Sequence, residues 1–269
     1  MAKLPMSERE LEIAIALFED GMSLTKIAKL LGRDRNKMAK KFNERGIETK
    51  QGFHNKKSFN KNFFDEWNEK SAYWLGFIFA DGHLSEKNGL EVCIKDKEHI
   101  EKFKADINSE HKISTRIVSG YAYYRLTIHD TYLGNQLRNL GVVHNKTYYW
   151  EIPKVPDEYM CHFIRGVFDG DGSLYINKDA EYKGGHCTYS IVSYNIEVLN
   201  SLKNAIVRTS NLTEQDIHIY NNKNRVPCLN ICTIKGLDEI FHYMYSDATV
   251  YLDRKYNKYL DYCRLKTKR

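Results

Sequence analysis

The sequence predicts an α+β protein in which one unit occurs twice, preceded by a small all-helical domain. The first observation is a repeat, because YWLGFIFADGHL at 73–84 and FIRGVFDGDGSL at 163–174 match at an offset of 90 residues. The second is that both copies continue with helix-like and strand-like segments in the same order. The third is a series of short amphipathic helices with capping residues ahead of the first copy. The resulting boundaries are 1–46 for the helical domain, 47–62 for a basic linker, 63–150 for the first copy and 151–269 for the second.

The N-terminal domain is predicted to contain three short helices. Ser7 and Ser23 are placed to cap helices over 7–20 and 24–31, and a third helix covers about 34–45. Glycines follow all three helices, as is typical of helix ends. The sequence SLTKIAKLLGRDRNKMAKKF resembles the helix-turn-helix of resolvases and transcriptional regulators, whose last helix enters the major groove of DNA. The residues that would contact DNA there are Arg33, Arg35, Asn36, Lys37, Lys40 and Lys41.

The charge distribution supports a nucleic-acid partner for this part of the chain. Residues 21–62 contain twelve Lys and Arg but three acids, a net charge of +9, whereas the whole chain carries +6. The remainder therefore carries −3. A basic segment attached to a nearly neutral body is typical of a polyanion-binding module. The alternative is a helical bundle that binds protein, which the charge disfavours.

Each repeated copy is predicted to run helix, two strands, helix, two strands, helix. The strand candidates are 90–95, 112–118 and 121–128 in the first copy, and 173–178, 187–193, 216–221 and 228–234 in the second. The later helices are 96–107 and 133–140 in the first copy, and 195–206, 237–244 and a final amphipathic helix at 251–263 in the second. The segments 96–107 and 195–206 align without a gap. In GYAYYRLTI, Tyr123 and Arg125 alternate with apolar residues, which predicts an antiparallel strand with one polar face.

Small residues recur on the first helix of each copy. Gly76 and Ala80 are four residues apart, as are Gly166 and Gly170, so each pair lies on one helix face. Such faces let two helix backbones approach closely. If the two copies pack through these faces, they form a pseudo-dimer, with Asp81 and Asp171 side by side at one end.

That end of the helix pair is electrostatically unfavourable for two acids. The carboxyl end of a helix is partially negative, and neighbouring carboxylates repel each other. A divalent cation reverses this balance, since carboxylate and carbonyl oxygens suit Mg²⁺. Asp81 and Asp171 therefore predict metal-assisted hydrolysis with a metal-bound water. An EF-hand is excluded, because its sixth and twelfth positions would be Leu174 and Ala180.

WLGFIFADG and IRGVFDGDG together resemble the LAGLIDADG motif of homing endonucleases, and the resemblance extends over about 63–264. It implies a duplicated αββαββα core with pseudo-two-fold symmetry, whose antiparallel sheets form a saddle over DNA. It also implies that Asp81 and Asp171 are catalytic and bind metal together with the carbonyls of Ala80 and Gly170. The expected cofactor is Mg²⁺ or Mn²⁺, with Ca²⁺ as a non-cleaving substitute. The expected products carry short 3′ overhangs, one phosphodiester being cut on each strand.

The resemblance suggests further site residues and one departure. Lys146 and Lys255 would lie near the scissile phosphates and stabilise charge in the transition state. The earlier acid of the motif is present as Asp169 but is replaced by Phe79 in the first copy, and we expect it to be a supporting residue. DNA contacts are expected from Arg116, Tyr123, Arg125, Tyr175, Asn177, Tyr189, Tyr220, Lys223, Arg225 and Asn230.

Two functions remain open on this basis. The first is a site-specific DNA endonuclease, freestanding or encoded in an intron or phage element; the second is a regulator or intron maturase that binds without cutting. Both acids are present, which favours the enzyme, and the unequal copies favour a monomer on a long asymmetric target. An intein is disfavoured, because splicing residues are missing at both ends. Six cysteines without a CxxC pair predict a reduced, cytoplasmic protein. No apolar run approaches about 18 residues, so no membrane span is predicted. The expected host is a bacterial or phage-infected cell, with an organelle as the alternative.

Overall fold

The structure is a computed structural model that describes residues 6–47, 49, 57–144, 151–176, 187–223 and 225–267. The chain divides into two compact units, Met1–Lys57 and Ser58–Arg269. Among the described residues, no helix is long and apolar enough to cross a membrane.

The smaller unit contains the three helices that the capping residues predict. They are α1 (Glu8–Glu19), α2 (Leu24–Leu30) and α3 (Arg35–Glu44). Ser7 forms the predicted capping box with Glu10, and the side chain of Ser23 accepts a hydrogen bond from the first turn of α2. The unit has its own apolar core, in which the rings of Phe18 and Phe42 meet edge to face at 5.4 Å.

The larger unit contains two copies of the helix and strand order expected from the repeat. The first copy is α4 (Glu69–Asp81), β1 (Gly82–Leu84), β2 (Gly89–Ile94), α5 (Lys97–Asp106), β3 (Ser114–Val118), β4 (Tyr121–His129) and α6 (Thr131–Asn139). The second is α7 (Met160–Asp171), β5 (Gly172–Ile176), β6 (Cys187–Val192), α8 (Ile196–Thr209), β7 (His218–Tyr220), β8 (Cys228–Ile231) and α9 (Ile234–Tyr245), preceded by the 3₁₀ turn η2 (Asp157–Tyr159) and followed by α10 (Asp253–Thr267). The predicted α+β class and the duplicated order are confirmed. Strand β1 is an addition, because its three residues are too few for an alternating pattern.

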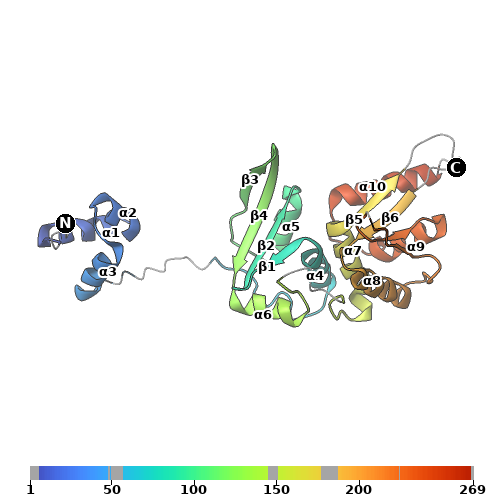
Figure 1. Cartoon of the computed structure of the whole chain (residues 1–269), viewed down its shortest axis with the longest axis horizontal. Coiled ribbons are helices and arrows are strands. Elements are labelled where there is room, and N and C mark those ends of the chain that lie inside the picture. The colour runs from blue at the N-terminus through green and yellow to red at the C-terminus, as the bar shows by residue number, and fades with distance from the viewer. Residues whose placement is uncertain are drawn as a thin grey trace. The chain divides into compact units, whose positions relative to one another are not determined.

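Each copy forms a four-stranded antiparallel sheet. The strand orders are β1-β2-β4-β3 and β5-β6-β8-β7. The registers correspond as well, since Gly82 pairs with Val92 in one sheet and Gly172 with Ile191 in the other. Alternate residues of the central strands point to the helices and join one continuous core, whereas the residues between them are less buried. Figure 1 shows α4 and α7 between the two sheets.

Helices α4 and α7 approach through the small residues that the sequence places on one face of each. A Cβ atom on Gly76 would lie 2.1 Å from the carbonyl oxygen of Phe163, and one on Gly166 would lie 2.0 Å from that of Tyr73. A Cβ atom on Gly170 would lie 2.3 Å from the Cβ of Ala80. These distances exclude larger side chains, so glycine allows this helix contact.

A second pair of glycines ends these two helices. Gly82 and Gly172 have extended backbone conformations, and the strand of each sheet begins at the glycine itself. A Cβ atom would lie 2.6 Å from the Ile78 carbonyl oxygen at Gly82 and 2.5 Å from the Phe168 carbonyl oxygen at Gly172. Glycine therefore lets the chain pass from helix to strand without a loop, which places the preceding aspartate at a defined helix end.

We predict that Gly166→Val destabilises the larger unit by a few kcal/mol, at or above the usual range of about 1–3 kcal/mol for overpacking. The added side chain must push α4 and α7 apart, because the clashing atom is backbone. Urea unfolding followed by circular dichroism measures the change. Asn204→Val, at an exposed position of α8, is the matched control for a β-branched residue in a helix. An equal loss in both variants would contradict close packing as the cause.

Candidate functional site

The two predicted acids lie at the joined ends of the helix pair. Asp81 and Asp171 are the last residues of α4 and α7, and both are exposed. The helix ends are close, since a Cβ atom on Gly170 would lie 3.5 Å from the amide nitrogen of Asp81. Two carboxylates therefore face solvent from one end of a rigid helix interface.

Lys255, which the family resemblance placed near a scissile phosphate, has buried contacts in the structure. It is 5% exposed, and its Nζ donates hydrogen bonds to the carbonyl oxygens of Phe168, Asp169 and Gly170 at 2.5, 2.7 and 3.2 Å. These are carbonyls of the last turn of α7, where a cation offsets the partial negative charge. Lys255 is therefore a cap of α7, and not an open contact for a phosphate.

The same ammonium group is a counter-ion for the acids of the site. Burial lowers the pKa of Lys255 to about 8, while the carboxylates of Asp169, Asp81 and Asp171 act in the opposite direction. The repulsion that the sequence predicts between the two helix-end acids is therefore partly offset by a lysine from α10, far away in the sequence.

Asp169, the earlier acid of the second motif, is fully buried at the helix interface. Its Oδ2 accepts hydrogen bonds from the Tyr73 hydroxyl at 2.7 Å and from the Leu252 amide at 2.8 Å, while its Oδ1 has no partner among the described residues. Burial raises the pKa of Asp169 to about 6. The Tyr73 oxygen also lies 3.0 Å from Nε2 of His99, whose pKa burial lowers to about 3. The imidazole of His99 is therefore neutral, and its Nε2–H donates to the Tyr73 hydroxyl oxygen. Together with the bond from Tyr73 to Asp169, this forms a continuous chain of hydrogen bonds.

The first copy has no acid at the corresponding place. Phe79 packs against the ring of Phe163, with 5.9 Å between the ring centroids. The acid of this buried polar chain therefore comes from the second copy alone, while Tyr73 and His99 come from the first. Its contacts to Tyr73 and Leu252 hold together the two central helices and the start of α10, which agrees with a supporting role.

A partly buried ion pair that the sequence pattern does not predict also joins the two copies. Arg165 of α7 is fully buried and pairs with Glu69 of α4 at 2.6 Å. Its guanidinium also donates to the carbonyl oxygens of Met244 and Val250 at 2.6 and 2.9 Å. The sequence signal was the single charge within the apolar run FIRGVF, where the first copy has Leu75.

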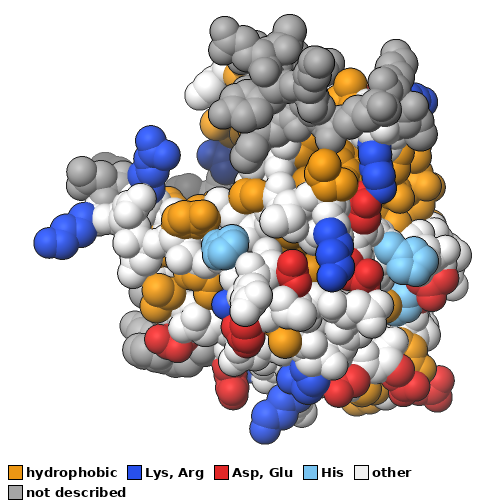
Figure 2. All heavy atoms as spheres, turned by 90° about the vertical axis from the view of Figure 1, so that its right-hand side faces the viewer, with side chains coloured by type: hydrophobic (Ala, Val, Ile, Leu, Met, Phe, Trp, Pro, Cys, Tyr) orange, Lys and Arg blue, Asp and Glu red, His pale blue; other side chains and the backbone are white. Residues whose placement is uncertain are grey.

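The predicted DNA-contact residues of the sheets are placed unequally. Arg116, Tyr175, Tyr220, Lys223 and Arg225 are exposed, whereas Tyr123, Arg125 and Asn230 are half-buried. Arg125 lies 3.7 Å from the carboxylate of Glu91 on the neighbouring strand. Lys146 and Asn177 lie outside the residues that the structure describes. The face seen in Figure 2 carries acidic and basic side chains interspersed.

Tyr189 is not a DNA contact, and that prediction was wrong. Its side chain is fully buried and stacks on Phe168 with 4.6 Å between ring centroids. Its neighbours Thr188 and Ser190 point to the opposite face of β6, because successive side chains alternate along a strand. The polar tip of tyrosine suggested the open face, but the alternation along β6 decides against it.

In the smaller unit, most of the predicted contacts are exposed on α3. Arg35, Asn36, Lys37 and Lys40 are exposed and Lys41 is half-buried. Arg33 instead pairs with Glu10 of the capping box, with 2.7 Å between Nη2 and Oε2. Its side chain is 19% exposed, so Arg33 holds α1 against the turn before α3.

Solved structures with a similar fold include homing endonucleases. The chain is similar to the homing endonuclease I-WcaI bound to its DNA recognition sequence, with a TM-score of 0.51 and 14% identity, over 74% of this chain and 91% of that one. The I-SmaMI LAGLIDADG homing endonuclease bound to cleaved DNA gives a TM-score of 0.46 at 14% identity, over 74% and 88% of the two chains. The N-terminal LAGLIDADG domain of DUF199/WhiA gives 0.45 at 16%, over 68% and 83%. The larger unit has the LAGLIDADG fold expected from the sequence.

Sequence similarity to known proteins extends over less of the chain than the structural similarity does. No protein-family model matches it. An uncharacterised protein of Methanocaldococcus jannaschii is 26% identical over 122 residues, which are 42% of this chain and 45% of that protein. The isomerising glutamine–fructose-6-phosphate aminotransferase of the same organism is 28% identical over 116 residues, 41% of this chain and 10% of that protein. The chain thus spans less than half of the length of either relative.

We predict that Lys255→Met lowers the free energy of unfolding by about 3 kcal/mol, because buried acceptors of a charged donor are left without it. The substitution removes the donor from the carbonyl oxygens of Phe168, Asp169 and Gly170. It also removes a positive charge that interacts with the buried carboxylate of Asp169. Chemical unfolding of the full chain measures the loss. The control is Lys235→Met, at an exposed position of α9. Equal stability of the two variants would argue against the capping role.

We predict a pH-dependent stability difference between the wild type and Asp169→Asn. The folded state binds a proton at Asp169 more tightly than the unfolded state, because the folded pKa is about 6 and the usual value is about 3.9. This contribution is present below about pH 4 and is lost as the pH rises through 6, a change of up to about 3 kcal/mol. Urea unfolding of both proteins between pH 4 and pH 7.5 measures it, and parallel pH profiles would refute it. Asp261→Asn, at an exposed position, is the control.

Proposed function

We propose that the protein is a site-specific endonuclease that binds double-stranded DNA and hydrolyses one phosphodiester on each strand, leaving short 3′ overhangs. The observation that carries the proposal is the pair of exposed carboxylates, Asp81 and Asp171, at the joined ends of α4 and α7. A helix end and a neighbouring acid both disfavour a carboxylate there. Both side chains are exposed at this unfavourable place, and their placement therefore favours a role towards a ligand.

The donor set fits a hard divalent cation. Among the described residues, no three His, Cys, Asp or Glu side chains gather into a metal-binding cluster. Magnesium, however, is commonly held by one or two carboxylates, with waters and substrate phosphate oxygens completing its shell. Asp81 and Asp171, with the carbonyls of Ala80 and Gly170, would hold Mg²⁺ or Mn²⁺, with Ca²⁺ supporting binding but not cleavage. When bound, the cation would supply an activated water and neutralise charge on the phosphate.

The rest of the chain would bind and orient the DNA. The exposed basic and tyrosine side chains on the open sheet faces would contact phosphates and bases, as such contacts set affinity, register and specificity. The exposed side chains of α3 would extend the contact beyond the sheets, since Arg35, Lys37 and Lys40 belong to the basic segment. The different side chains of the two halves suit a long asymmetric target bound by a monomer.

The contact between Lys255 and Gly170 favours a second candidate function. The Lys255 ammonium lies 3.2 Å from the Gly170 carbonyl oxygen, so a cation is already present beside one proposed metal ligand. A protein that binds DNA without cutting, such as a regulator or an intron maturase, could use the same fold with this internal cation in place of a metal. The two exposed acids favour the nuclease.

We predict that Asp81→Asn and Asp171→Asn each lower cleavage by at least about 100-fold, since even outer-shell partners of a metal contribute about 10–100-fold. Binding in Ca²⁺ should persist, because both side chains keep their size. Nicking and double-strand cleavage are measured in Mg²⁺ on the DNA that flanks the coding sequence. Asp261→Asn, exposed on α10, is the matched isosteric control. Wild-type binding without any cut strand would favour the regulator or maturase.

A further inference from the structure

An exposed aromatic side chain lies on the loop between β6 and α8. Tyr194 is 90% exposed, the highest exposure among the large hydrophobic side chains of the described residues. Its backbone surroundings are well anchored, because the Ser193 amide donates to the Pro227 carbonyl oxygen at 3.1 Å. The Asn195 amide donates to Ser193 Oγ at 3.2 Å, and the Asn195 side chain caps α8. The ring is therefore presented to solvent from a fixed loop.

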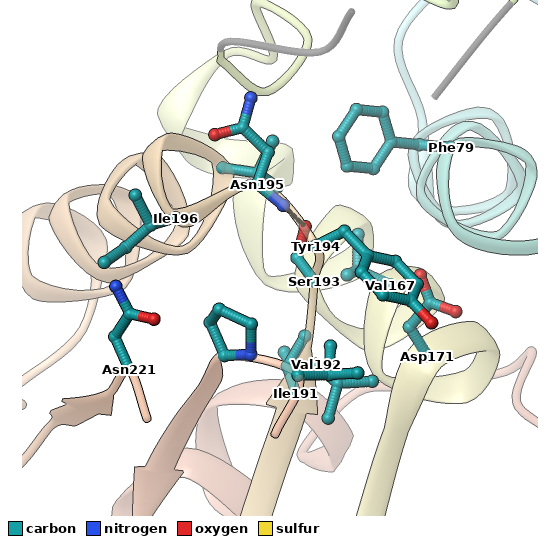
Figure 3. Close-up of a pocket in the computed structure, with 13 residues that line it drawn as sticks. Phe79, Val167, Asp171, Ile191, Val192, Ser193, Tyr194, Asn195, Ile196 and Asn221 are labelled. Atoms are coloured by element: carbon teal, nitrogen blue, oxygen red, sulfur yellow. Dashed lines mark hydrogen bonds between the residues drawn. The ribbon is translucent and has the colours of Figure 1, made fainter. Parts of the chain in front are cut away.

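Tyr194 and Asp171 line the same cavity, which has a volume of about 760 Å³ (Figure 3). Its walls are mainly apolar and include Phe79, Val167 and Ile191 from α4, α7 and β6. Asp171 is the acidic residue among those that line it, so a phosphate bound at this carboxylate would lie at the wall of the cavity that Tyr194 also lines. The exposed ring and the proposed cleavage centre are thus neighbours.

The chemistry of this ring suits a nucleobase. An aromatic face exposed to water gains free energy when it stacks on another flat apolar surface, and every base offers one. A tyrosine also loses little conformational entropy on binding, having few rotatable bonds. A base beside the phosphodiester at Asp171 is the flat group that the proposed substrate would bring to this place.

The first copy presents a different side chain at the corresponding position. Asp96 and Asn195 align as the residues before α5 and α8, so Lys95 corresponds to Tyr194. The Lys95 ammonium lies 4.2 Å from the ring centroid of Tyr121 and 5.4 Å from that of Tyr123, over the open face of the first sheet. One half therefore offers a cation at this position and the other an aromatic ring, which distinguishes the two halves of a target.

We propose that Tyr194 stacks on a nucleobase next to the phosphodiester held at Asp171 and contributes to sequence selection by the second half. This inference rests on the proposed DNA-binding function. Tyr194 is a specificity-determining residue here and not a catalytic one, since its ring would contact a base and not the reacting phosphate.

Photocross-linking tests the contact without requiring cleavage. DNA from the region flanking the coding sequence, with 5-iodouracil in place of thymine, is bound in Ca²⁺ and irradiated. The expected result is a cross-link on Tyr194, located by mass spectrometry of the digested complex. Tyr194→Phe should retain it at position 194, and Tyr194→Leu, which keeps an apolar side chain but not the ring, should lose it. Cross-links to other residues alone, in a complex of undiminished affinity, would overturn the proposal.

Cleavage of a DNA library tests specificity. With the base pairs around the cut site randomised, Tyr194→Leu should accept a broader set of sequences than the wild type, by about tenfold at one base pair or more. Tyr194→Phe should keep the wild-type profile. Identical profiles for all three proteins would refute the inference, and unchanged thermal midpoints exclude misfolding as a cause of any difference. If the wild type binds but cuts nothing, the nuclease proposal fails while the cross-link still decides the role of Tyr194.

Discussion

The close contact between α4 and α7 is the interaction on which the rest of the larger unit depends. Because Gly76 and Gly166 have no side chains, each helix backbone lies against a carbonyl group of the other. This contact joins the two copies and makes their sheets parts of one body with a shared core. It also brings the two helix ends together, so the separation of Asp81 and Asp171 follows from backbone packing and not from flexible loops.

The buried charged side chains at this interface come from the second copy and not equally from both. The second copy contributes Arg165, Asp169 and Lys255, and their hydrogen bonds reach α4, the last turn of α7 and the segment before α10. The first copy has Leu75 and Phe79 at the places of Arg165 and Asp169. We expect this polar network to favour one pairing of the halves, since a shifted pairing would leave buried charges unpartnered. The same asymmetry extends to the surface, where Lys95 and Tyr194 occupy corresponding positions.

The sequence was sufficient for the features that local patterns determine. Helix caps at Ser7 and Ser23, the duplicated element order and the small-residue faces all follow from spacing and from the repeat. The glycine that follows each motif aspartate is explained by the structure, because a side chain on Gly82 or Gly172 would clash with a carbonyl group of the preceding helix. Strand β1 was missed because three residues show no period, and Tyr189 was assigned to the wrong face because a tyrosine suits either side of a sheet.

The sequence by itself determined the fold class, the two copies and the two acids at matching helix ends. These depend on short-range periodicity and on the comparison of one copy with the other. The tertiary structure decided what neutralises the acids and which polar groups are buried, because those partners are far apart in the chain. Lys255 reaches the end of α7 from more than eighty residues away, and Glu69 meets Arg165 across the helix pair. No local pattern encodes such contacts, since they arise only when the two copies pack through their glycines.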